Sequence, residues 1–108
     1  MENILDSIKK LLGIDKELTQ FDQDVAMDIN TSLLALNQIG VGPSEGFSIK
    51  DYSEEWTDLI GDRKDLEAVK TYVYLKTRLL FDPPQSGFLV DAIKAQISEI
   101  EWRLMTQV

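Results

Sequence analysis

Hydrophobic residues recur every three or four positions along most of the chain, the spacing of α-helices that bury one face. Four long segments show it, and we expect helices over residues 2–12, 22–39, 63–81 and 86–105. The stripes of the first, second and last segments are formed by Ile4, Leu5, Ile8, Leu11 and Leu12, by Val25, Ile29, Leu33 and Leu36, and by Phe88, Leu89, Ala92, Ile93, Ile97, Ile100 and Leu104. This pattern predicts an all-α fold.

The segment 63–81 has a centre, Thr71-Tyr72-Val73-Tyr74-Leu75, that favours a strand by propensity alone. No Gly or Pro interrupts it, however, and helical spacing is kept by Leu66, Val69, Val73 and Leu80. We therefore predict a helix that is apolar on most sides and central in the fold. Asp62 is its expected N-terminal cap, and Asp82-Pro83-Pro84 ends it because proline cannot continue a helical ladder.

Glycine and proline predict one long loop, residues 40–47, with the sequence Gly40-Val41-Gly42-Pro43-Ser44-Glu45-Gly46-Phe47. Helix-start signals follow at residues 53–56, so we expect a short helix with Trp56, Leu59 and Ile60 inward, closed by Gly61. The predicted architecture is a compact helical bundle of four to five helices with this Gly/Pro loop. We expect a single domain over residues 1–108.

A weaker second stripe runs along the segment 22–39, away from its main apolar face. It consists of Met27 and Leu34, with Asn30 and Asn37 between them. Such a stripe is usually partly exposed surface, but it is also compatible with a subunit contact.

The composition removes several common chemistries. The 108 residues include 44% hydrophobic residues, enough for a core, but no His and no Cys. The chain therefore lacks the usual near-neutral general base, the thiolate nucleophile, the ordinary zinc ligands and disulfides. An enzyme is not expected, and neither is a cofactor. The acidic start lacks a signal peptide's pattern and no stretch suits a bilayer, which favours a protein of cytoplasmic origin without a membrane.

The net charge of −8 is unevenly distributed. Residues 1–62 contain thirteen Asp or Glu and four Lys, giving −9, whereas residues 63–108 contain six acids and seven Lys or Arg, giving +1. Because an acidic chain repels phosphate, tight binding to a nucleic-acid backbone is disfavoured. The charge also keeps a small domain soluble, which is its simplest interpretation.

Three site interpretations are weak. The glycine-rich loop follows a helix and lacks a Gly-Lys-Ser/Thr sequence, so we interpret it as a turn or contact loop and not a phosphate site. Asp22, Asp24 and Asp28 do not fit a calcium loop, and we interpret them as a solvated helix edge. The acidic residues at 54, 55 and 58 are typical of a first helical turn.

The aromatic residues are not interleaved with basic ones, as a surface that stacks single-stranded nucleic acid would require. We interpret them as core or interface residues; they are Trp56, Tyr72, Tyr74 and Trp102. Lys9 and Lys10 hint at a membrane surface, but two lysines are too few against the overall charge.

The order of motifs resembles the small head–tail connector, or adaptor, proteins of tailed phages and prophages of Gram-positive bacteria. The resemblance covers most of the chain from about Asp22, and its most specific part is Leu79-Leu80-Phe81-Asp82-Pro83-Pro84. The other motifs that carry it are Leu36-Asn37-Gln38-Ile39-Gly40-Val41-Gly42-Pro43, Gly46-Phe47, Trp56, the run from Val69 to Arg78, and Glu99-Ile100-Glu101-Trp102-Arg103-Leu104.

The resemblance implies a structural subunit that docks as a homo-oligomeric ring on the portal protein, extends the DNA channel and carries the next connector, stopper or tail protein. It implies a virion component that is found in the host cytoplasm before assembly, for which a monomer is possible in isolation, and that makes only passive contact with packaged DNA. The candidate interface and loop residues are Gly40, Val41, Gly42, Pro43, Gly46, Phe47, Asp82, Pro83, Pro84 and Trp102.

Two further hypotheses concern how such a subunit works. The acidic half would line the channel and repel DNA, and the 40–47 loop would change conformation on docking. The alternative from a different class is a small cytoplasmic regulatory adaptor of a prophage that binds a host or phage protein.

Overall fold

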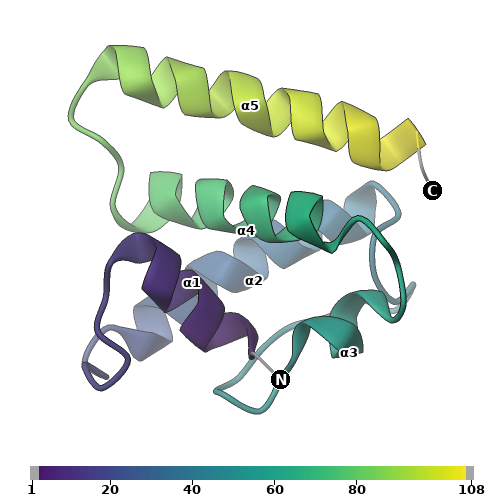
Figure 1. Ribbon diagram of the computed structural model, residues 1–108, viewed down its shortest axis with the longest axis horizontal. Helices are drawn as coiled ribbons and strands as arrows, with labels where there is room; N and C mark the ends of the chain where they lie inside the picture. The colour runs from purple at the N-terminus through teal and green to yellow at the C-terminus, as the bar shows by residue number, and fades with distance from the viewer. Residues whose placement is uncertain (1–2, 107–108) are drawn as a thin grey trace.

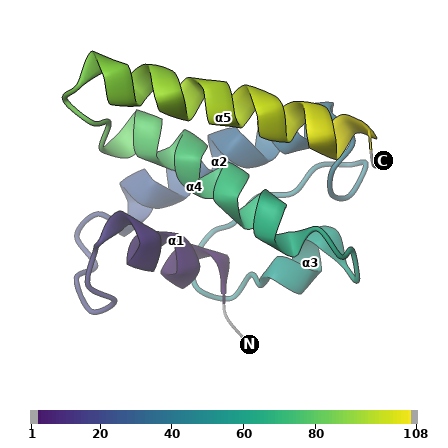
Figure 2. The ribbon, with the colours of Figure 1, turned by 45° about the horizontal axis from the view of Figure 1, so that its top comes forward.

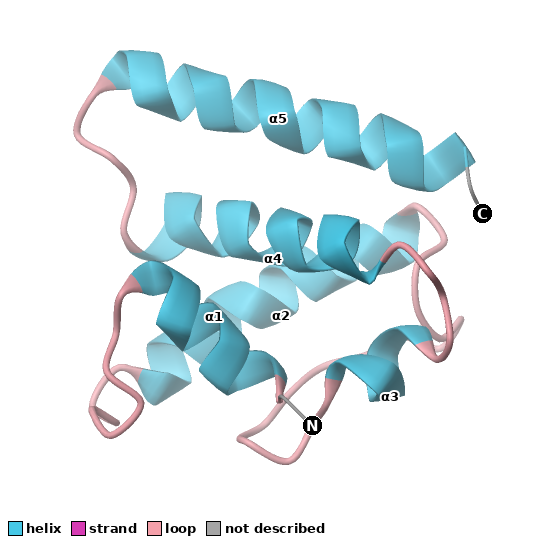
Figure 3. Ribbon diagram, in the orientation of Figure 1, coloured by secondary structure: helices cyan, strands magenta, loops and turns pink. Residues whose placement is uncertain are grey.

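The computed structural model describes residues 3–106, and these form five helices (Figure 1). They are α1 (Ile4–Leu12), α2 (Asp22–Gln38), α3 (Trp56–Ile60), α4 (Leu66–Phe81) and α5 (Gly87–Thr106). The described residues contain no strand (Figure 3), only an isolated antiparallel bridge between Asn3 and Glu55. The predicted all-α fold is confirmed.

Helix α4 is the centre of the bundle, as the sequence predicted. It packs against α1, α2 and α5, and Val69, Tyr72 and Val73 are fully buried. Figures 1 and 2 show α5 along one side of α4, with α1 and α3 on the side away from α5. Burial therefore overrides the strand propensity of this segment, because a helix can contact neighbours on several sides at once.

The core is assembled from all five helices and from two residues of the connection between α2 and α3. The stripes predicted for the first and second helices supply much of it, and Trp56 and Leu59 point inward from α3 as expected. The buried hydrophobic residues are Ile4, Leu5, Ile8, Val25, Ala26, Ile29, Leu33, Leu36, Val41, Ile49, Trp56, Leu59, Val69, Tyr72, Val73, Leu75, Ile97 and Leu104.

Helix boundaries differ most from the prediction at the start of α4. The helix begins at Leu66 and its N-cap is Asp65, so the predicted start at Arg63 and the predicted cap Asp62 are wrong. The Arg63 guanidinium donates two hydrogen bonds to the Asp65 carboxylate, at 2.8 and 2.6 Å. This local pair ties the segment down before the first helical turn. The predicted helix start at Glu2 lies outside the described residues.

The last helix also departs from its predicted packing. Of the stripe expected to face the core, Ile97 and Leu104 are buried and Ile93 and Ile100 are half-buried, but Phe88 and Leu89 are exposed. Leu80, at the end of α4, is exposed as well. Because α5 packs mainly against α4 at the edge of the bundle, it buries only a narrow stripe. Within residues 3–106, no helix has the length and apolarity needed to cross a membrane.

Candidate functional site

The loop over residues 40–47 is held to the bundle at both ends. The Asn37 amide donates to the carbonyl oxygen of Pro43 at 2.9 Å, and the Val41 amide donates to that of Leu36 at 2.9 Å. Beyond the loop, Asn30 both donates to and accepts from the backbone of Ile49, at 3.0 and 2.7 Å. Asn30 and Asn37 thus anchor this connection, a role that the helical pattern of α2 did not reveal.

Only part of this loop is open to a partner. Among the candidate interface residues, Val41 is buried in the core and Phe47 packs partly against it, whereas Gly40 is exposed. Gly40, Gly42 and Gly46 all have positive φ values, of 91°, 93° and 94°. These conformations suit glycine because it has no Cβ. The glycines therefore fix the path of the loop.

Gly42 has a second reason to be glycine, which gives a testable prediction. A Cβ at this position would lie 3.0 Å from Cδ1 of Leu59, whereas a Cβ at Gly46 would meet nothing within 4 Å. We expect Gly46→Ala to cost about 1–2 kcal/mol of unfolding free energy through its positive φ alone. Gly42→Ala should cost about 1 kcal/mol more, because Leu59 must move. Urea unfolding of the two variants measures the difference; equal losses would contradict the role of Leu59.

The Asp82-Pro83-Pro84 turn joins α4 to α5. The Asp82 amide donates to the Arg78 carbonyl at 2.9 Å, which closes the last turn of α4, and the prolines then turn the chain towards α5. Asp82 and Pro83 are exposed and Pro84 is half-buried. This turn therefore presents a rigid, solvent-facing corner, with Trp102 far along α5 from it.

A buried ionic cluster connects α1, α2 and the segment that precedes α3. Lys9 is completely buried, so it does not lie on any surface that could face a membrane. Its Nζ lies 2.8 Å from Oδ1 of Asp22 and donates to the carbonyl oxygens of Lys16 and Leu18 and to the Tyr52 hydroxyl. The Tyr52 hydroxyl in turn donates to Asp22. The sequence contained one indication that Lys9 is buried. Lys9 follows Leu5 by four residues, which places it at the edge of the buried stripe of α1.

The cluster shifts the pKa values of both charged groups. Burial acts to lower the pKa of Lys9, but hydrogen bonds and charge from Asp22 and Tyr52 outweigh it and raise the pKa above its ordinary value. For Asp22, burial acts to raise the pKa, and the bonds from Lys9 and Tyr52 outweigh it and lower the pKa. Both shifts favour the charged forms, so the cluster is a structural ion pair at neutral pH.

The acidic residues of α2 do not converge on one point. Asp22 is engaged by Lys9, while Asp24 and Asp28 remain on the outer side, where burial and the neighbouring Asp24 charge raise the pKa of Asp28. Within residues 3–106, no three His, Cys, Asp or Glu side chains lie together in a way that would hold a metal ion. The acidic residues before α3 instead form its start, where Glu55 and Asp58 make a capping box.

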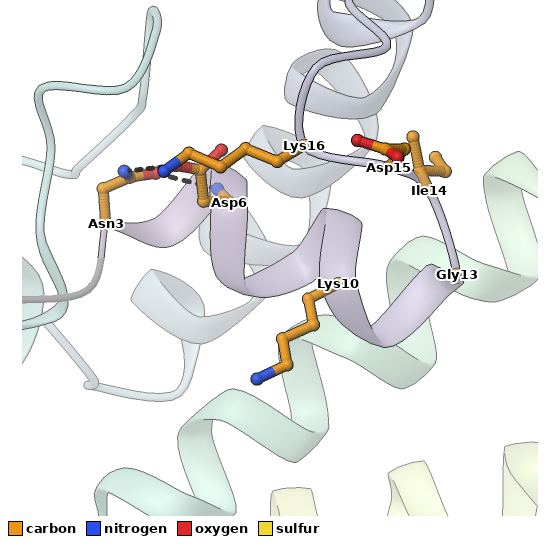
Figure 4. Close-up of a pocket in the computed structure, with 7 residues that line it drawn as sticks. All are labelled: Asn3, Asp6, Lys10, Gly13, Ile14, Asp15 and Lys16. Carbon is orange, nitrogen blue, oxygen red and sulfur yellow. Dashed lines mark hydrogen bonds between the residues drawn. The ribbon is translucent and has the colours of Figure 1, made fainter.

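A surface depression beside α1 is lined by both signs of charge (Figure 4). Asp6 accepts from Asn3 in the N-terminal cap of α1, Lys10 points away from that pair, and Asp15 and Lys16 come from the following turn. Two lysines and two aspartates offset each other, so the depression has no charge preference for an anionic or cationic ligand.

Two strips of exposed apolar side chains remain on the helices. On α2 they are Met27, 64% exposed, and Leu34, 59% exposed. On α5 the most exposed are Phe88, at 71%, and Trp102, at 67%, and Leu89 and Met105 are exposed as well. Such residues at helical spacing on an outer face are typical of protein contacts. Trp102 is therefore not a core residue, and Met27 and Leu34 occupy the exposed position that the second stripe predicted.

The family of phage connector proteins is the class that these features fit, and its sequence profile matches residues 4–108. The chain belongs to this family, whose members are structural proteins of the phage particle. Neither a curated protein nor a solved structure matches the chain. The resemblance inferred from the motifs is thereby confirmed at the level of the family.

Proposed function

We propose that this connector docks as a homo-oligomeric ring on the portal vertex, extends the DNA channel and provides the platform for the next connector, stopper or tail component. The match to phage connector proteins over residues 4–108 carries this proposal. The whole chain, one domain, acts as the subunit. The exposed apolar strips on α2 and α5 supply surfaces for contact with neighbours.

The charge distribution supports a passive channel wall. Most of the acidic excess lies on α2, which has three aspartates and no basic residue, and on the connection over residues 39–55, which has four acids and one lysine. If α2 and this connection face the lumen, their negative charge repels DNA phosphate and lets the duplex slide. A ring whose lumen is lined by Lys and Arg would contradict this orientation.

Docking is tested with the portal protein encoded by the same phage. The purified chain is mixed with purified portal and imaged by electron microscopy. We expect additional ring density on the portal vertex. An unaltered portal beside a free monomer would contradict the connector assignment at the portal and favour the alternative, a small cytoplasmic prophage adaptor for another protein.

A separate measurement tests the hypothesis that the 40–47 loop changes conformation on docking. Hydrogen exchange of residues 40–47 is compared between the free chain and the portal-bound ring. Greater protection in the ring is expected if docking orders the loop against a partner. Equal protection in both states would contradict a conformational change there.

A further inference from the structure

The first turns of α2 and the last turn of α4 border a groove on the surface of the bundle. Five residues line it, three from α2 and two from α4: Asp24, Met27, Asp28, Leu80 and Phe81. We call these five residues the α2–α4 groove. The Phe81 ring packs edge-to-face on Phe21, which precedes α2, with the ring centroids 5.8 Å apart. This aromatic contact holds the two helix ends together and so fixes the shape of the groove.

The apolar side chains of the groove are largely open to solvent. Met27 is 64% exposed, Leu80 is 52% exposed and Phe81 is half-buried. The last two belong to the motif over residues 79–84, the most specific part of the family resemblance. The volume of the groove, about 330 Å³, is at the lower end of the range for ligand sites, which suits a single inserted side chain.

The carboxylates of the groove have no cationic partner. Asp24 and Asp28 lie one turn apart on α2, and within residues 3–106 no Lys or Arg forms an ion pair with either. α2 has no basic residue, and the exposed Asp82 follows directly after α4. Burial and the charge of Asp24 raise the pKa of Asp28, as expected of a carboxylate without a cation beside it.

Cations on the neighbouring elements have partners elsewhere. In the C-terminal half of α4, Arg78 donates to the Tyr74 hydroxyl at 3.1 Å and Lys76 lies over an aromatic ring of the same helix. Lys9, the buried cation of α1, pairs with Asp22. The negative charge of the groove is therefore not neutralised from within the fold.

A buried hydroxyl lies one helical turn before the α4 side of the groove. Thr77 precedes Leu80 by three residues and Phe81 by four, so the three share one face of α4. Thr77 is 0% exposed, and its Oγ1 has no hydrogen-bond partner among the described residues. A buried hydroxyl without a partner is unfavourable, and a donor that enters between Leu80 and Phe81 would satisfy it.

We propose that the α2–α4 groove receives an arginine side chain from a basic and apolar segment of a partner protein. The aliphatic stem of the arginine packs on Met27 and Leu80, and its guanidinium binds the carboxylates of Asp24 and Asp28. The guanidinium has five N–H donors, enough for both carboxylates and for the Thr77 hydroxyl. This inference goes beyond the proposed ring function, because it gives the chemistry of a partner and does not depend on a ring.

Charge selects against the other occupants. The chain has a net charge of −8, so a second copy is repelled, and nucleic-acid phosphate is repelled as well. The arginine in the last turn of α5, Arg103, is already paired with Glu99 at 2.9 Å. The occupant is therefore a segment of a different protein that contributes positive charge together with apolar side chains.

The proposal divides the acidic residues between two roles. An arginine in the groove neutralises Asp24 and Asp28, which makes them part of a protein contact. The acidic connection over residues 39–55 then supplies the negative wall of the proposed channel.

A peptide titration tests the groove. The probe is a synthetic peptide of alternating leucine and arginine residues, and its control is the same peptide with uncharged citrulline in place of arginine. Isothermal titration calorimetry with the free chain should show binding of the arginine peptide alone. The double variant Asp24→Asn, Asp28→Asn should weaken binding by about tenfold or more, because hydrogen bonds to charged groups are lost.

A second double variant separates the groove from the overall charge. Asp62→Asn, Asp91→Asn also removes two carboxylates, both exposed and outside the groove. At physiological ionic strength it should weaken binding by about twofold or less, because distant exposed charges are screened. Equal weakening by the two double variants would show attraction to net charge only and overturn the proposal.

The apolar and hydroxyl groups have their own variants. Leu80→Ser should weaken binding of the arginine peptide, whereas Leu11→Ser, at an exposed apolar position on α1, should leave it unchanged. Thr77→Val should weaken binding without loss of stability in urea unfolding, because it removes a hydroxyl that has no partner in the fold. Undiminished binding by Thr77→Val would contradict the part assigned to the hydroxyl.

Failure of this inference is distinguishable from failure of the proposed function, because the titration uses no portal. Ring density on the portal, with an arginine peptide that binds no better than the citrulline peptide, would overturn the groove and leave the connector function intact. Groove-dependent binding without ring density would do the reverse. Self-association of the free chain in analytical ultracentrifugation, abolished by Asp24→Asn, Asp28→Asn, would make a second copy the occupant and overturn the proposal. Circular dichroism confirms that each variant is folded.

Discussion

Asp22→Asn is expected to lower the free energy of unfolding by about 3–5 kcal/mol, the cost of breaking a buried ion pair by removing one partner. The change keeps the shape of the side chain but removes the negative charge that lies 2.8 Å from Lys9 Nζ. Lys9 is 0% exposed, so its ammonium cannot turn to water instead. Chemical denaturation followed by circular dichroism measures the loss.

Lys9→Met provides the matched control. It leaves the Asp22 carboxylate, whose side chain is 18% exposed and still accepts from Tyr52, so the remaining charge is partly hydrated. We expect a smaller loss than for Asp22→Asn, and the double variant should lose less than the two single losses added together. A loss below about 1 kcal/mol for Asp22→Asn, or simple additivity, would contradict a stabilising pair.

The same pair determines part of the response to acid. The pKa of Asp22 is lower in the folded chain than its ordinary value, which is about 3.9. Its contribution is therefore complete above that ordinary value and is lost as the pH falls through the lower, folded-state pKa. The gap in stability between the original chain and Asp22→Asn should shrink as the pH is lowered from 7 towards 3. A constant gap would contradict the lowered pKa.

Trp56→Ala is expected to cost about 3–5 kcal/mol, as for other large aromatic residues removed from a core. Trp56 begins α3 and is 4% exposed, and its Nε1 donates to Oγ of the buried Ser7 in α1 at 2.9 Å. The substitution removes both the packing and the link between these helices. Urea unfolding of the free chain measures it.

Two further variants show how much of this loss in unfolding free energy comes from the hydrogen bond and how much depends on burial. Trp56→Phe keeps much of the packing but leaves the Ser7 hydroxyl without its donor, for an expected loss of about 1–3 kcal/mol. Trp102→Ala removes the same residue type from an exposed position and should change stability by about 0.5 kcal/mol or less. A large loss at Trp102 would show that this residue stabilises the fold itself, against its assignment to a contact between subunits.

Together these variants separate the residues that hold the domain from those available to partners. Lys9, Asp22 and Trp56 act within the bundle, whereas Leu34 and Trp102 have most of their surface in solvent. Substitutions in the first group should change unfolding, and those in the second should change assembly. This contrast is expected of a subunit that folds first and then assembles.

The sequence by itself determined the helices and the family. Helical spacing and the Gly and Pro positions located all five helices to within a few residues, because these signals depend on local backbone chemistry. The motifs from Asp22 onward indicated the phage connector family that the match over residues 4–108 confirms. The exposed position of Met27 and Leu34 also followed from spacing alone, since they lie opposite the stripe of α2 that packs on the core.

Only the tertiary structure decided which of two apolar faces is buried and which charges are paired. α5 has apolar residues on more than one face, and its packing at the edge of the bundle leaves Phe88 and Trp102 outside. Lys9 finds its partner thirteen residues away, in another helix, and a third group in Tyr52. Local periodicity cannot determine such contacts, because they depend on how separate helices are arranged around α4.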